Sequence, residues 1–122
     1  MLAEAIIGLS ITLFVALIMI GLGVSQLKSK TPVGFYTGEK PPEPGQLSNV
    51  AAWNKKHGTM WITYGIVIIL FYAVPLFGVG MDSVWFSVLY GTGYILPIPV
   101  MMWYHSRLVK TYKLPEKNRH KI

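Results

Sequence analysis

Long apolar runs separated by short polar segments dominate the pattern of this chain. Three stretches contain no Asp, Glu, Lys or Arg: residues 5–27, 58–81 and 83–106. A helix rises about 1.5 Å per residue, so about 20 apolar residues cross the ~30 Å hydrocarbon core of a bilayer. We therefore predict an all-α integral membrane protein that forms a single membrane domain over residues 1–122. Its three transmembrane helices are expected at residues 3–27, 58–78 and 83–106.

The third span contains two prolines in the sequence YGTGYILPIPVMMWYHS. Pro97 and Pro99 have no amide hydrogen to donate to the carbonyl groups of Gly93 and Ile95. Carbonyl groups freed inside a bilayer need another donor, and the hydroxyl of Tyr94 is a local candidate. We predict a kink in this span at Pro97 and Pro99.

The segment between the first two spans, residues 28–57, is long for a simple connection. Its PPEPG sequence at 41–45 predicts an extended turn. Ser48 or Asn49 follows and can cap a new helix, which begins at VAAWNKKHG. We predict a structured loop whose short helix lies in the membrane interface before the chain turns into the second span.

The second and third spans are joined by the short sequence GVGMDS, which predicts a tight antiparallel hairpin. Residues equally far from the turn then lie at similar depth in the membrane. On this basis we expect three pairs of residues at matched depth: His57 with His105, Trp61 with Met101, and Tyr72 with Tyr90.

The chain has a net charge of +6, and its charged residues are distributed as the predicted topology requires. All eleven Lys and Arg residues lie between spans one and two or after span three, in a basic tail at 107–122, whereas Glu4 and Asp82 lie on the other side. Basic residues favour the cytoplasmic side, so we expect the N-terminus outside and both the loop and the C-terminus inside a cell membrane. The basic excess then indicates anionic lipid headgroups as a partner, and no nucleic acid.

Few residues offer catalytic or metal chemistry. The chain has no cysteine, and no acidic residue lies within the uncharged stretches 5–27, 58–81 and 83–106, which disfavours a proton-coupled transporter. His57 and His105 are weak metal candidates, with Glu39 or Glu43 as an added oxygen ligand. We assign no cofactor and no catalytic residue. Two alternatives stay open: an oligomeric transporter or channel that uses the broken third span, and a small membrane enzyme acting on lipid.

Three short motifs resemble the SdpI/YhfL family of small bacterial membrane proteins. Gly34-Phe35-Tyr36-Thr37 resembles a G-Y-R-T motif, with Tyr36 where the family has Arg, and Trp53-Asn54 resembles a later W-x-x-A/N element. The sequence from Ile98-Pro99 to Tyr104-His105-Ser106 resembles the end of the last span. The resemblance implies immunity to a secreted toxic peptide, or signalling by holding a regulator at the membrane.

Together these observations predict a small, non-enzymatic membrane protein whose loop binds a peptide, protein or lipid partner. Self-association is compatible with the lateral surface of three spans, but no heptad or GxxxG pattern in them specifies its order. The predicted binding residues are Gly34, Phe35, Tyr36, Thr37, Trp53, Asn54, His57, Tyr94, Pro97, Pro99, Tyr104 and His105.

Overall fold

The computed structural model describes residues 2–35 and 40–115, which fold almost entirely into helices. The α-helices are α1 (Leu2–Lys28), α2 (Val50–Gly78), α3 (Val84–Ile95) and α4 (Pro97–Tyr112). One turn of 3-10 helix, η1 (Pro44–Gln46), lies between α1 and α2. The described residues form no strand, only an isolated antiparallel bridge between Leu47 and Lys113.

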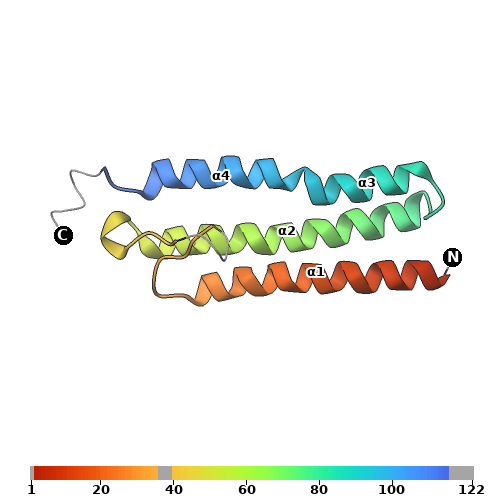
Figure 1. The fold of residues 1–122 in the computed structure, drawn as a ribbon, viewed down its shortest axis with the longest axis horizontal. Helices are drawn as coiled ribbons and strands as arrows, with labels where there is room; N and C mark the ends of the chain where they lie inside the picture. Colours follow the sequence, from red (N-terminus) through yellow and green to blue (C-terminus); the bar gives the residue numbers. More distant parts are fainter. Residues whose placement is uncertain (1, 36–39, 116–122) are drawn as a thin grey trace.

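The helices form three rods that run side by side (Figure 1). The middle rod is α2, with α1 on one side and the α3–α4 arm on the other. The N-terminus lies beside the turn between α2 and α3, which we call the hairpin end, and the other end is the loop end. Each rod is long and apolar enough to cross a membrane: Leu2–Lys28, Val50–Gly78 and Val84–Tyr112. The prediction of three spanning helices is confirmed at this level.

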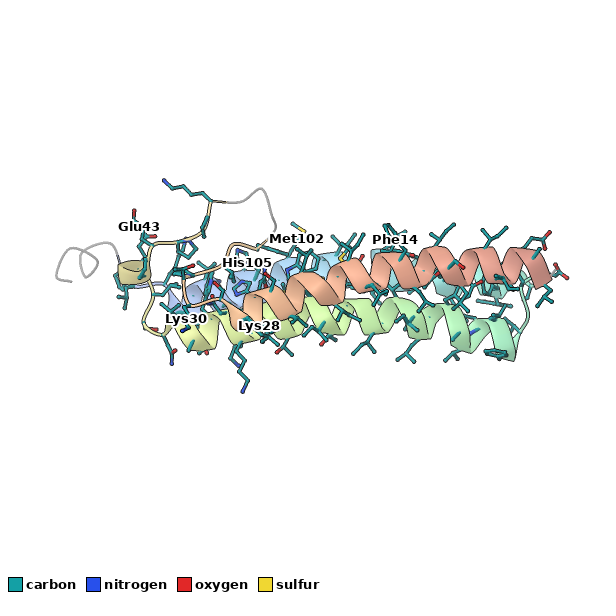
Figure 2. All side chains as sticks on the ribbon, turned by 90° about the horizontal axis from the view of Figure 1, so that it is seen from below. Phe14, Lys28, Lys30, Glu43, Met102 and His105 are labelled. Atoms are coloured by element: carbon teal, nitrogen blue, oxygen red, sulfur yellow. The ribbon has the colours of Figure 1, made fainter. Side chains whose placement is uncertain are left out.

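Large apolar side chains cover the outside of the bundle. Phe14 and Met102 point outward from α1 and α4 (Figure 2), and Phe77 on α2 is 87% exposed. The residues that α1 buries are small: Thr12, Ala16 and Gly23. Lipid tails are as apolar as leucine, so helices in a bilayer associate by close packing of small residues.

Glycine allows the backbones of α1 and α2 to meet near the loop end. A Cβ atom added to Gly58 would lie 2.6 Å from the carbonyl oxygen of Gly23, and one added to Gly23 would collide with the carbonyl oxygen of Gly58. Deeper in the bundle, a Cβ on Gly65 would lie 2.9 Å from the carbonyl oxygen of Ala16. These close approaches fix how α1 packs on α2.

The predicted separate interfacial helix is wrong. The segment that begins at Val50 continues in line to Gly78 as one helix of 29 residues, capped by Asn49, whose side chain accepts from the amide of Ala52 at 2.9 Å. The straight path places Trp53 and His57 against the loop and α4, where both side chains are buried. Burial against protein replaces the expected burial of this segment in the headgroup region.

The third rod is interrupted for one residue at Leu96, directly before Pro97. Leu96 keeps helical dihedral angles, with φ −60° and ψ −39°, and its amide donates to the carbonyl of Thr92 at 2.9 Å. The hydroxyl of Tyr64 on α2 donates to the carbonyl of Tyr94 at 2.8 Å. A neighbouring helix therefore supplies a donor to the carbonyl that lies between those of Gly93 and Ile95 in the sequence.

Candidate binding site at the loop end

Asn54 on α2 fastens the chain that leaves α1. Its Oδ1 accepts from the amide of Val33 at 3.0 Å, while its Nδ2 donates to the carbonyl groups of Ser29 at 3.1 Å and Thr31 at 2.9 Å. The side chain is only 2% exposed. Because buried polar groups are costly when unpaired, this set of bonds defines one path for residues 29–33.

The next residues of the loop are held by three further side chains. The indole of Trp53 donates to the carbonyl of Val33 at 2.8 Å, and the indole of Trp61 donates to that of Phe35 at 2.9 Å. Between them, Gln26 donates to the carbonyl of Gly34 at 3.2 Å. Loop 29–35 is thus bonded to both α1 and α2 along its length.

A small hydrophobic core lies beneath the second part of the loop. Leu47, Trp53 and Leu108 are buried in it, with Tyr104 of α4 packed against them. The chain after α4 also joins it, because Ser48 donates to the carbonyl of Tyr112 and Leu114 donates to that of Gln46, both at 2.8 Å. We call this unit, residues 29–35, 44–57 and 104–114, the loop cap.

His57 and His105 meet inside the loop cap, as the hairpin register predicted. His57 Nε2 lies 2.9 Å from His105 Nδ1, and His57 is fully buried. His57 Nδ1 lies 2.8 Å from the carbonyl oxygen of Trp53, which can only accept, so Nδ1 carries a hydrogen. In neutral His57 the Nε2 atom is then an acceptor, and His105 donates from Nδ1. A second proton on His57 would require His105 to move its hydrogen from Nδ1 to Nε2, so that His105 Nδ1 could accept.

This geometry predicts an unusual tautomer for each ring. At neutral pH, ¹⁵N NMR of histidine-labelled protein is expected to show His57 with the hydrogen on Nδ1 and a bare Nε2, and His105 with a hydrogen on Nδ1. Replacing His105 with phenylalanine should keep the His57 tautomer, because the carbonyl of Trp53 sets it, while shifting the Nε2 resonance. A His57 with its hydrogen on Nε2 would contradict the bonding described.

Aromatic rings surround the histidine pair. The ring of Phe35 lies 4.5 Å from that of His105 and 6.1 Å from that of Trp61, measured between ring centres. The ring of Trp53 lies 4.2 Å from that of His57. Phe35 of the loop therefore lies directly against His105 of the pair.

The pair does not extend to a larger ligand set in the described part of the chain. No group of three or more His, Asp or Glu side chains comes together among residues 2–35 and 40–115. Glu43 lies at the N-terminus of η1 and points outward from the loop, whereas His105 lies within the bundle (Figure 2). Glu39 lies outside the described residues. The two histidines contact each other directly as a hydrogen-bonded pair.

A chain of hydroxyl groups lies deeper in the bundle. The Tyr90 hydroxyl lies 2.7 Å from the Thr12 hydroxyl and 3.1 Å from that of Tyr94, and Thr12 also donates to the carbonyl of Gly8 at 2.7 Å. The rings of Tyr72 and Tyr90 lie 5.1 Å apart, which confirms that predicted pair. The hydroxyl bonds join α1 to α3, which is the role expected of polar side chains between helices in a membrane, and the ring contact adds α2.

The structure gathers part of the predicted binding set. Gly34, Phe35, Trp53, Asn54, His57, Tyr104 and His105 belong to the loop cap or the bonds within it. Tyr94 lies in the hydroxyl chain and Pro97 lines a groove between α2 and α4, which Pro99 does not. Tyr36 and Thr37 lie outside the described residues.

Sequence reasoning missed Gln26 and Trp61 as residues that hold the loop. Trp61 follows His57 by one helical turn and Trp53 by two, so these side chains share a face of one continuous helix. That spacing was visible in the sequence, but the expected turn before residue 58 assigned Trp61 to a different element.

Three helices long and apolar enough to span a bilayer define the class of the chain: it is a multi-pass membrane protein. No family model, curated protein or solved structure matches it. The resemblance to the SdpI/YhfL family stays a prediction from short motifs.

Proposed function

We propose that this protein is a non-enzymatic binding protein that recognises a peptide or protein partner through its loop cap. The observation that carries the proposal is a set of four side chains whose hydrogen bonds fix the backbone of loop 29–35, two buried (Trp53 and Asn54) and two half-buried (Gln26 and Trp61). A connection between two spans needs no such fastening. A preorganised loop binds a partner without the cost of ordering the loop on association.

The distribution of charge supports a cytoplasmic location for the loop cap. Lys28, Lys30, Lys55, Lys56 and Arg107 all belong to the loop end, whereas Asp82 lies in the turn at the hairpin end. Under the positive-inside bias, the N-terminus is then outside and the C-terminus inside the cell membrane.

A kink at Pro97 and Pro99 belongs to the same proposal. Such a kink would tilt α4 and, with it, residues 104–114 of the loop cap. In the SdpI/YhfL-like interpretation, the partner is a toxic peptide or a membrane-held regulator.

Site-specific photo-cross-linking in cells that express the protein tests this function. A photoreactive residue at Lys40, which is exposed in the loop, is expected to give an adduct of defined mass, and one at Met81 in the hairpin turn is expected to give none. The same adduct should disappear in Trp53→Ala, because that change removes the bond to Val33 and opens the small core of the loop cap.

Trp103→Ala is the matched control, because Trp103 is 61% exposed on α4 and lies outside that core. Membrane insertion of each variant is checked by its resistance to extraction with carbonate. An adduct that survives in Trp53→Ala, or adducts that form only at Met81, would contradict recognition by the loop cap.

A further inference from the structure

A groove of about 380 Å³ lies between α2 and α4, on a face that α1 does not line. It begins at Lys56 and runs past Met60 and Val67 on one wall, with Met101, Val100 and Pro97 on the other. The interruption at Leu96 borders it, so the groove follows the part of the third rod that belongs to α4. Its volume falls within the range of small-molecule sites.

The groove is lined mainly by apolar side chains, and two of the hydroxyl groups in its walls are bonded within the protein. Thr63 donates its hydroxyl to the carbonyl of Thr59, and Tyr64 donates to that of Tyr94, both at 2.8 Å. These hydroxyls are bonded within the protein, so the surface between them suits a hydrocarbon chain. Met60 and Met101 are unbranched and adaptable, which lets the walls fit a flexible chain.

The loop end of the groove carries positive charge. Lys56 lines it and is exposed, and among residues 2–35 and 40–115 no Asp or Glu lines it. The contact between His57 and His105 sets the register of α2 and α4, so Arg107 lies at about the depth of Lys55 and Lys56. An apolar groove with a lysine at one end is complementary to an acyl chain with a phosphate at its head.

We infer that the groove between α2 and α4 is a binding site for an anionic phospholipid, with one acyl chain along the groove and the phosphate at Lys56. The site goes beyond the proposed function, because its ligand is a lipid and it uses no residue of loop 29–35, although it shares Lys56 and Tyr104 with the loop cap. An acyl chain gains little by leaving the bilayer for an equally apolar groove. The protein therefore selects between lipids by the charge of the headgroup at Lys56. The groove sets the position of the bound acyl chain.

Native mass spectrometry of the full chain, released from nanodiscs of mixed phosphatidylglycerol and phosphatidylcholine, tests this site. We expect one retained phosphatidylglycerol per chain. Lys56→Gln should lower the ratio of retained phosphatidylglycerol to phosphatidylcholine about fivefold, which corresponds to ~1 kcal/mol for one basic residue at anionic lipid. Val100→Phe, which places a ring in the groove, should abolish retention of either lipid at this site.

Each variant has a matched control on the same helix. Lys55→Gln removes the same charge from the neighbouring position, and Ile98→Phe adds a ring at an exposed position; neither residue lines the groove. Both controls should retain the lipid as the unchanged protein does. If Lys55→Gln and Lys56→Gln lowered the retention of phosphatidylglycerol equally, the effect would come from general surface charge, and the proposed site would be overturned. A dimer that Val100→Phe dissociates would also overturn it, by assigning the groove to a second copy of the chain.

Discussion

Gly23→Val is expected to lower the free energy of unfolding by about 3 kcal/mol, the upper end of the usual cost of overpacking. A side chain at position 23 would meet the carbonyl oxygen of Gly58 and, at 2.9 Å, the backbone nitrogen of Ile62. Both contacts are with backbone, which cannot rotate away as a side chain can. α1 must therefore separate from α2. Unfolding in mixed micelles, followed by circular dichroism as the fraction of denaturing detergent rises, measures the change.

Gly21→Val is the control for this prediction. It makes the same change two residues away on α1, where an added Cβ meets nothing within 4 Å. Both variants gain the same helix propensity, so their difference isolates the contact with α2. Similar unfolding free energies for the two variants would contradict the close approach of the two helices.

Asn54→Ala is expected to open loop 29–35 while leaving the three spanning helices in place. The change removes three hydrogen bonds and leaves the Val33 amide without its acceptor. At about 1 kcal/mol for each bond, the local cost is about 3 kcal/mol. Cleavage by trypsin after Lys30 should then become about a hundredfold faster, because cleavage of a transiently open segment follows the population of the open form.

Asn49→Ala separates loss of the loop from general loss of stability. Asn49 caps α2 through a single bond to the Ala52 amide, and removing such a cap costs about 1 kcal/mol. Its effect on cleavage after Lys30 should be small, since Asn49 does not bond to residues 29–35. Equal cleavage rates in the two variants would show that Asn54 does not fasten the loop.

Both predictions concern contacts at the loop end, where the structure departs most from expectation. The length of the segment and its PPEPG sequence indicated a structured loop, but they did not indicate which residues hold it. Asn54 bonds to backbone groups of Ser29, Thr31 and Val33, more than 20 residues earlier in the chain. Such bonds leave no periodic signal, because the groups they satisfy are backbone atoms that every residue possesses.

The straight path of α2 shows a second limit. Lys55 and Lys56 beside an apolar run indicated a boundary at the membrane surface, and the prediction placed a turn there. In the structure both lysines are exposed, while Trp53 and His57 on the same turns are buried by the loop and α4. Charged residues on one face of a helix indicate where that face meets water or lipid headgroups. Whether the helix continues depends on the tertiary contacts that its other face makes.

The sequence by itself determined the features that depend on length, composition and short connections. Three uncharged runs specify three spanning helices, and a short turn specifies the antiparallel hairpin that brings His57 to His105 and Tyr72 to Tyr90. Tertiary structure alone decided the loop cap and the groove between α2 and α4, together with the role of Trp61. Each of these depends on how side chains from separate helices meet, and the distance between helices is set by packing that no single segment encodes.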